Sequence, residues 1–233
     1  MRESRPSRGL KALEFTTAPL AGAVDGMNEA GLCITYNYGF TIDQPKASAT
    51  PISMAISEAL ARCLTVTEAV DFISSMPRWG GALLMLGDAD GDIASLELSS
   101  TRHRLRRPAD GEDELNHTNA FSSSHMREVQ VPWDAVYTND APAPLRGRRL
   151  HQSSESRDQR FRQLLAEVDV LDANLLGAIM ADHGSDDTPS DDTPCVHGSY
   201  WFTTACLQFF PRARRIRVAY NTACQASFED VEF

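Results

Sequence analysis

The sequence lacks three features that would each point to a particular class of protein. It has no apolar run near the roughly 18 residues that span a bilayer, so no membrane association is expected. It has no Cys-x-x-Cys pair and no Cys/His spacing typical of a metal motif, so neither a metal nor a cofactor is expected. Its 22 basic residues against 32 acidic ones give a net charge of −10, which disfavours a nucleic-acid partner because phosphates would be repelled.

Cysteines are also few, and their spacing does not suggest disulfide pairs. The five cysteines are odd in number and widely scattered: Cys33, Cys63, Cys195, Cys206 and Cys224. This is typical of reduced thiols, and we expect a cytoplasmic protein. The start, MRESRPSRGLKALEF, is basic but has no apolar core of the kind a secretory signal needs. The basic clusters at 104–107 and 212–217 lie beside turns and are interpreted as solvated rims.

The length and composition favour one globular domain over residues 1–233. Of the 233 residues, 42% are hydrophobic and 23% charged, which is enough apolar material for a substantial core. Residues 1–19 are expected to be irregular, and 122–155 and 184–194 to be long surface loops. The second loop repeats SDDTP, and its Pro and Ser content favours a surface loop over a metal site despite four aspartates.

Alternating and helical patterns divide the rest of the chain. Residues 31–40 predict a strand with a bulky face carrying Tyr36 and a small, polar face carrying Asn37. Helices are expected from Pro51, from Thr65 with Glu68 at capping-box spacing, and over 157–168 and 172–182. Residues 81–100 predict a hairpin whose DADGD turn lacks the Gly and Glu of an EF-hand loop. Two terminal strands follow. Strands and helices in separate runs favour an α+β fold with stacked antiparallel sheets.

Three further stretches resemble one enzyme family when taken in order. They are DGMNEAGL (25–32) followed by Asn37, NHTNAF (116–121), and the ending from PCVHG to FTTACLQFFPRARRIRVAYNTAC. Together they resemble the acyl-coenzyme A:6-aminopenicillanate acyltransferase family of autoproteolytic cysteine N-terminal nucleophile enzymes, which is more distantly related to the choloylglycine hydrolases. The resemblance runs from about Leu20 to Cys224.

The resemblance implies a four-layer α/β/β/α sandwich of the N-terminal nucleophile hydrolase type and an acyl transfer at an amide or thioester. In that chemistry a Cys thiolate attacks, its own α-amino group acts as base, and amide N–H groups stabilise the oxyanion. By this likeness Asn37 and Asn119 are the catalytic amides, and Tyr36, His117 and Thr118 are expected to contact the substrate. The residues alone leave structural alternatives open: Asn37 as a partner of a strand-end backbone group, and His117 as a loop anchor.

The nucleophile of the family has no counterpart in this sequence. No cysteine precedes Cys33, and Cys33 lies inside a strand between Leu32 and Ile34, where a small core residue is expected. The chain is therefore interpreted as an N-terminally incomplete family member, inactive by itself. The alternative is a catalytically inactive remnant that binds a small molecule or a protein.

Two further points concern the substrate and a rival nucleophile. Family members often have Arg where this chain has Val196, so either substrate selection differs or a neighbouring Arg takes its place. A hydrolase using Cys195 and His197 is a weaker alternative. The expected partner is a small acylated substrate, with a coenzyme A thioester as one candidate acyl donor. The sequence does not decide the oligomeric state.

Overall fold

The computed structural model describes residues 1–45, 48–225 and 227–233. The chain packs as two compact units. Unit 1 comprises Met1–Val131, Phe209–Ile216 and Glu232–Phe233, and unit 2 comprises Pro132–Gln208 and Arg217–Val231. The single domain expected over residues 1–233 is therefore divided into two compact units.

Unit 1 is built on a seven-stranded sheet in the order β1-β2-β3-β4-β7-β8-β9. Every neighbouring pair in it is antiparallel. Its strands are β1 (Arg2–Ser4), β2 (Ala12–Phe15), β3 (Asp25–Asn28), β4 (Cys33–Gly39), β7 (Gly81–Gly87), β8 (Ile93–Leu98) and β9 (His103–Arg106). The irregular start expected over residues 1–19 is wrong, because β1 and β2 pair there and extend the sheet at its edge. Their few apolar residues gave too short an alternation to predict strands.

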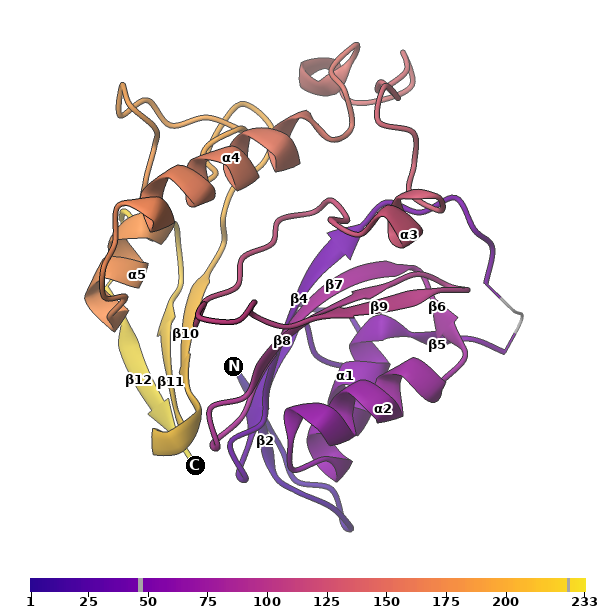
Figure 1. Cartoon of the computed structure of the whole chain (residues 1–233), viewed down its shortest axis with the longest axis vertical. Coiled ribbons are helices and arrows are strands. Elements are labelled where there is room, and N and C mark those ends of the chain that lie inside the picture. The colour runs from indigo at the N-terminus through magenta and orange to yellow at the C-terminus, as the bar shows by residue number, and fades with distance from the viewer. Residues whose placement is uncertain (46–47, 226) are drawn as a thin grey trace. The chain divides into compact units, whose positions relative to one another are not determined.

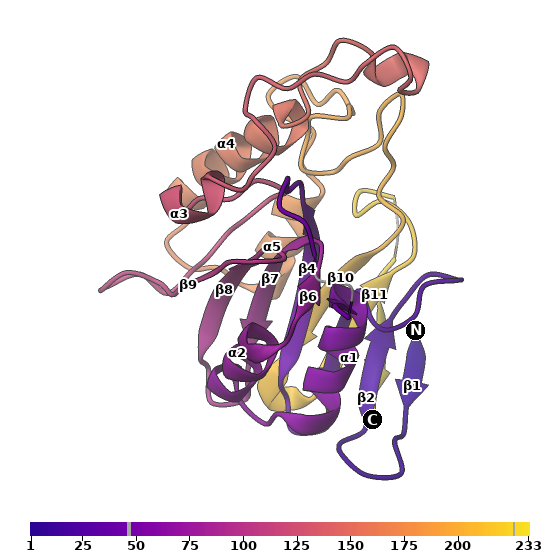
Figure 2. The ribbon, with the colours of Figure 1, turned by 90° about the vertical axis from the view of Figure 1, so that its right-hand side faces the viewer.

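Two helices, α1 (Ile52–Arg62) and α2 (Val66–Ser75), cover one face of this sheet (Figure 1). Figure 2 shows the two helices side by side against the strands. Aliphatic side chains from both layers form the core, among them Ile34, Ile56, Leu60, Ile73, Leu84 and Leu96. Burying one such side chain contributes about 1.5–3 kcal/mol, so this layer stabilises unit 1 as a whole.

The starts of α1 and α2 lie within one residue of the predicted positions. The Thr65 hydroxyl accepts the Glu68 N–H at 3.2 Å, as the predicted cap requires. The Glu68 carboxylate accepts the Leu64 N–H at 2.7 Å, one residue earlier than an ideal capping box. Pro51, expected as the first helical residue, is instead the N-cap of α1 and pairs in the short parallel ladder of β5 (Thr50–Pro51) with β6 (Arg78–Trp79).

The segment DGMNEAGL divides between strand and turn. Asp25 and Gly26 were expected in the turn, but they lie in β3, where a Cβ on Gly26 would meet the Leu60 side chain at 2.7 Å. The turn proper runs from Asn28 to Leu32. Gly31 adopts a φ of +95°, and a Cβ there would lie 2.6 Å from the Pro211 carbonyl oxygen. This turn fixes the register of β4, which carries Asn37.

The predicted hairpin over 81–100 is confirmed as β7 and β8. In its DADGD turn the Asp88 carboxylate accepts the N–H groups of Asp90 and Asp92, each at 3.1 Å. The acidic side chain thus serves the backbone, as in an ordinary Asx turn.

Unit 2 contains two further helices and residues of a second sheet. Its helices are α4 (Gln152–Ala166) and α5 (Ala173–Met180), and Asp172 caps α5 as predicted by accepting the Leu175 N–H. The second sheet has the order β10-β11-β12, with bounds Cys206–Phe210, Arg215–Ala219 and Glu229–Glu232. The terminal pair of strands is therefore confirmed, joined by the short 3-10 helix η2 (Pro211–Ala213).

The two predicted loops are more ordered than expected. Residues 122–155 contain α3 (Ser124–Arg127), the 3-10 helix η1 (Ala143–Leu145) and the beginning of α4. Residues 184–194 hold no helix or strand, but Asp191 is buried and accepts the N–H groups of Tyr200 and Trp201. The low-complexity composition therefore did not reveal that a buried aspartate anchors this loop.

No helix in the described part of the chain is both long and apolar enough to cross a bilayer. The α+β class is confirmed, because the sheet of unit 1 is antiparallel and the longer helices come in consecutive pairs.

Candidate active site

The two faces of β4 differ in character. Ile34 and Tyr36 pack towards the core beneath α1 and α2. Asn37 points to the opposite face, paired across the ladder with Leu83. On that face Leu83 packs in a second cluster with Phe121, Met126 and Val129. The second face is thus covered by the chain that follows β9 rather than by α1 and α2.

The structure brings Asn37 and Asn119 together within unit 1. The Asn37 side-chain amide donates to the Thr118 carbonyl oxygen at 3.3 Å. The Asn119 side-chain amide donates to the Tyr38 carbonyl oxygen at 2.9 Å. Both bonds join residues 81 apart, so residues 118–119 lie alongside residues 37–38 in matched order. An amide NH₂ carries two hydrogens, and the bond to Thr118 uses one of those on Asn37.

Several polar residues of the sheet hold the segment that carries Asn119. The Arg106 guanidinium donates to the Asn116 carbonyl oxygen, and Ser95 Oγ lies 3.1 Å from His117 Nδ1. The buried Glu97 carboxylate accepts both the N–H and the hydroxyl of Ser122. Sequence reasoning did not identify these anchors. A signal was available: Ser95 and Glu97 alternate with Ala94, Leu96 and Leu98 in an otherwise apolar strand.

The three residues expected to contact substrate fall in different places. Tyr36 lies on the helix-facing side of β4, and its burial raises the pKa of its phenol to about 12. Thr118 is 3% exposed and supplies its carbonyl to Asn37. His117 is half-buried beside Ser95. Thr118 and His117 thus lie in the same segment as Asn119. Tyr36 points to the other face of β4, so its contact with substrate stays a prediction that this placement does not favour.

Asp25 is a titratable group close to the amide pair. Its carboxylate accepts the Tyr36 N–H at 3.0 Å, one residue before Asn37. Burial raises the pKa of Asp25 to about 6, although the bond from Tyr36 works in the opposite direction. Perturbed carboxyl groups gather at functional sites, and the sequence had assigned Asp25 only to a turn.

Three buried cysteines, two in unit 1 and one in unit 2, are not activated. Cys33 is buried on β4, and burial raises the pKa of its thiol to about 12. Burial likewise raises the pKa of Cys63 and of Cys206 to about 11. A nucleophilic cysteine needs a lowered pKa, so Cys33 is a core residue, as expected.

The Cys195 and His197 pair belongs to a larger group in unit 2. His197 Nε2 lies 2.8 Å from His183 Nε2 and 3.7 Å from Cys224 Sγ. Burial raises the pKa of the Cys195 thiol. The rival hydrolase based on a simple Cys195–His197 dyad is therefore not favoured.

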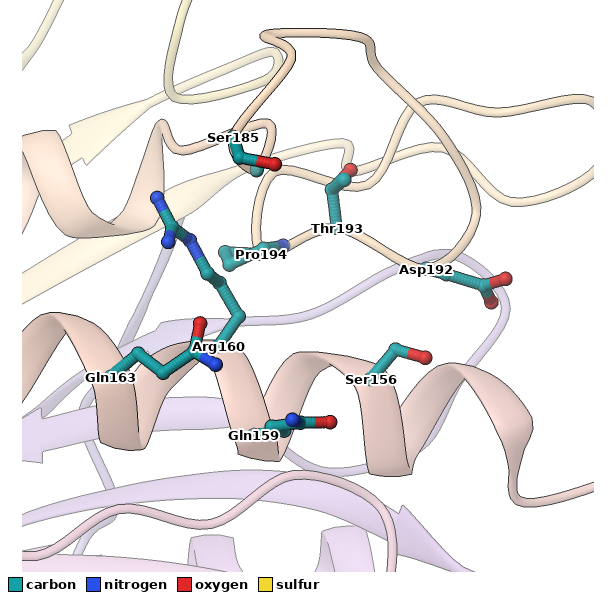
Figure 3. A pocket seen from close by; sticks show the side chains of 9 residues that line it. Ser156, Gln159, Arg160, Gln163, Ser185, Asp192, Thr193 and Pro194 are labelled. Atoms are coloured by element: carbon teal, nitrogen blue, oxygen red, sulfur yellow. The ribbon is translucent and has the colours of Figure 1, made fainter.

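A separate hollow of about 310 Å³ lies in unit 2 between α4 and the loop 184–194. Figure 3 shows Arg160 extending from α4 towards this loop, with Gln159 and Ser156 on the same helix. Its lining is mostly polar and offers neither a thiol nor an imidazole. It shares no residue with the amide pair.

The sequence and the fold were compared with known proteins. Residues 2–218 match the family described as acyl-coenzyme A:6-aminopenicillanic acid acyl-transferase. Among solved structures, penicillin V acylase from Agrobacterium tumefaciens is similar with a TM-score of 0.52 and 17% identity, covering 91% of this chain and 66% of that one. A single-residue variant of conjugated bile acid hydrolase from Clostridium perfringens is similar with a TM-score of 0.53 and 13% identity, covering 96% of this chain and 82% of that one. No curated protein matches the sequence.

These likenesses show the fold. The chain has the N-terminal nucleophile hydrolase fold of these structures, as the sequence motifs implied. It spans just under two thirds of the penicillin V acylase chain and about four fifths of the bile acid hydrolase chain.

Proposed function

Because the chain belongs to the acyl-coenzyme A:6-aminopenicillanic acid acyl-transferase family, we propose that it carries the oxyanion site of an amide hydrolase or acyltransferase. The observation that supports this most is that each of the two amides donates to the backbone of the other segment, so Asn119 lies beside Asn37 and Tyr38 near one end of β4. Carboxamides donate without titrating, so they suit a site where negative charge develops on an oxygen.

The proposed reaction is acyl transfer through a thioester. The α-amino group of a cysteine takes the proton of its own thiol, the thiolate attacks the acyl carbon, a C–S bond forms, and the carbonyl electrons move to the oxygen. Asn37 donates to this oxyanion, and Asn119 holds either the substrate carbonyl or the amino group of the nucleophile. When the intermediate collapses, the C–N bond breaks and the amine leaves with a proton from the α-amino group of the cysteine. Water or a second amine then attacks the thioester and gives up a proton to the α-amino group, the C–S bond breaks, and the cysteine is released.

The attacking cysteine is proposed to come from outside the 233 residues. Cys33 lies on the same face of β4 as Asn37, but its raised thiol pKa does not suit a nucleophile. Cys63 lies at the C-cap of α1, among the core residues beneath the helices. We therefore expect the 233-residue chain to be inactive when it is prepared alone.

The proposed substrate is a small acylated molecule. One structural relative acts on penicillin V and another on conjugated bile acids, and a coenzyme A thioester is a candidate donor for the transfer reaction. The net charge of −10 opposes a nucleic-acid substrate. All five cysteines are free thiols, which supports the proposed cytoplasmic location.

The experiment that tests this function uses the native gene product. The protein is purified from its natural source, its N-terminus is determined by mass spectrometry, and acyl release is measured from penicillin V, a conjugated bile acid and simple N-acyl amino acids. We expect a mature chain that begins with cysteine, releases the acyl group from at least one of these amides and loses activity after alkylation.

The opposite result also has a definite meaning. A native product that begins at Met1 and releases no acyl group, although it binds an N-acyl compound in calorimetry, would contradict the enzyme and favour the binding module. The 233-residue chain serves as the matched control, because it contains both amides and is expected to give no turnover.

A further inference from the structure

Four metal-ligating side chains meet in unit 2. They are His183, Cys195, His197 and Cys224, and their ligand atoms all lie within 4.8 Å of one another. They come from three places: the residues after α5, the residues that follow the loop 184–194, and the residues after β11. Two imidazoles and two thiols form the donor set of many structural zinc sites.

The distances within this cluster are close to those of a tetrahedral site. Zinc bonds of about 2.0–2.1 Å to nitrogen and about 2.3 Å to sulfur place two ligand nitrogens about 3.3 Å apart, and a nitrogen and a sulfur about 3.6 Å apart. His197 Nε2 and Cys224 Sγ are 3.7 Å apart, and the Nε2 atoms of His183 and His197 are 2.8 Å apart. A shift of about half an ångström between the two rings would bring the two nitrogens to the tetrahedral separation.

Polar side chains next to the ligands can orient them. The Asp187 carboxylate lies 3.1 Å from His183 Nδ1, on the side of the ring away from the nitrogen that faces the cluster. Thr222 Oγ1 lies 3.3 Å from Cys224 Sγ. Donors around a sulfur stabilise a metal-bound thiolate.

Asp182 fixes the chain on both sides of the cluster. Its carbonyl oxygen accepts the Cys195 N–H at 3.0 Å, and its carboxylate accepts the Gly184 N–H at 2.8 Å. The same carboxylate accepts hydrogen bonds from Nε and Nη2 of Arg160 on α4, at 2.8 and 2.7 Å. His183 and Cys195 are therefore held in place by a network that does not depend on a metal.

Unit 2 has a small core that a metal would supplement. Its buried apolar residues in the described part of the chain are six: Leu145, Ile179, Cys195, Cys206, Val218 and Ala219. Small units with little buried apolar surface often use a metal or a disulfide for stability. Cys195 is buried and Cys224 exposed, so an ion could reach the cluster from the solvent side.

We propose that His183, Cys195, His197 and Cys224 form a structural zinc site that joins the loop after α5 to the residues after β11. The sequence predicted no metal because these ligands follow no motif spacing; only the fold brings them together. The site is independent of the proposed acyl transfer, since it shares no residue with Asn37 or Asn119.

The test uses the 233-residue chain, purified under reducing conditions. Its zinc content is measured by inductively coupled plasma mass spectrometry, and the zinc-free chain is then titrated with Co²⁺. We expect one metal ion per chain, a visible spectrum typical of tetrahedral Co²⁺ with thiolate charge-transfer bands, and a higher Tm with zinc than without it. Cys224→Ser and His183→Ala are expected to weaken binding at least tenfold and to lose the zinc-dependent rise in Tm.

Two matched variants serve as controls. His125→Ala removes an exposed histidine of α3, and Cys63→Ser removes a cysteine of unit 1, so both should bind metal as the unchanged chain does. Zinc below one tenth of an equivalent with no thiolate bands in the reduced chain would overturn the proposal, as would unchanged binding in Cys224→Ser and His183→Ala. A Cys195–Cys224 disulfide that persists under reductant and excludes metal would do the same.

Discussion

At the scale of single residues, Asn28 shows how one side chain can organise a turn and a helix end. Its amide NH₂ donates to the carbonyl oxygens of Leu60 and Cys63, both at 2.8 Å. Its carbonyl oxygen accepts the N–H groups of Ala30 and Leu32 at 3.1 and 3.0 Å. Asn28 is fully buried, so each of these four groups depends on it.

Replacing Asn28 should therefore destabilise unit 1 strongly. Asn28→Ala leaves buried donors and acceptors unpaired, and we expect a loss of roughly 3 to 5 kcal/mol in the free energy of unfolding. Asn28→Asp should cost at least as much, because a carboxylate would face the two carbonyl oxygens. Urea unfolding measures both, with the exposed Asn139→Ala as control. A loss below about 1 kcal/mol for Asn28→Ala would contradict this role.

Asp25 should make stability depend on pH. Its pKa rises from 3.8 to about 6 on folding because burial disfavours the charge. The folded chain thus keeps this proton more tightly, and the contribution is complete below pH 3.8 and lost as the pH rises through 6. At about 1.4 kcal/mol per pKa unit, the loss is roughly 3 kcal/mol at most.

Asp25→Asn should remove this dependence. The neutral amide can still accept the Tyr36 N–H, so we expect the variant to be more stable than the unchanged chain at pH 7.5 and close to it at pH 4. Urea unfolding at both pH values gives the difference, and Asp110→Asn, in an exposed turn, is the control. A difference between variant and parent that is the same at both pH values would refute the shifted pKa.

Residue-level reasoning from sequence succeeded where a local pattern was sufficient. Thr65 and Asp172 cap helices as their spacing predicted. Asn28 and Asp25 could not be interpreted in the same way, because their partners lie up to 35 residues away. A capping motif is read within one turn of helix, whereas these contacts exist only after β3 meets α1 and β4.

At the scale of elements, Asp88 links a hairpin to a helix. Besides closing the β7–β8 turn, its carboxylate accepts the N–H of Val66, the first residue of α2, at 2.9 Å. A carboxylate at a helix N-terminus also interacts favourably with the helix dipole. The tight turn therefore positions α2 on the sheet as well as joining two strands.

Asp88→Ala should loosen both elements together. Three backbone N–H groups lose a buried acceptor, and we expect the free energy of unfolding to fall by roughly 2 to 4 kcal/mol. Amide exchange should become faster at Val66 and at Asp90. The exposed Asp71→Ala on the same helix should change little. Faster exchange confined to the hairpin, with α2 unaffected, would show that the link to Val66 carries no stability.

The elements that sequence predicted well have a periodic apolar face. The strand over 31–40, the hairpin and the two helices beneath the sheet all bury such a face. The start of α4 was missed because residues 152–156, QSSES, are polar. Two of them, Ser153 and Ser154, are nevertheless buried, and Ser153 donates to the Asp191 carbonyl oxygen. Because α4 buries polar residues at its start, that part of the sequence shows no apolar periodicity that would predict a helix.

At the scale of the whole chain, the candidate site depends on contacts between distant segments. Asn37 and Asn119 could be singled out by family motifs, but the sheet residues that hold the second segment, such as Glu97, could not. The two side-chain hydrogen bonds across 81 residues form only when β4, β8 and the segment 116–123 are in place. The motifs singled out the two residues, and the fold explains why residues 118–119 lie beside residues 37–38.

We propose that these two amides stabilise one developing negative charge. The direct measurement is kcat for acyl release by the mature native enzyme and its Asn37→Ala and Asn119→Ala variants, with Asn139→Ala as control and Tm checked for each. Loss of an oxyanion donor lowers kcat by about 10² to 10³, and we expect that loss for Asn37→Ala. We expect kcat to fall at least tenfold for Asn119→Ala and to stay unchanged in the control. Folded Asn37→Ala and Asn119→Ala variants that keep kcat within about threefold of the parent would contradict the claim.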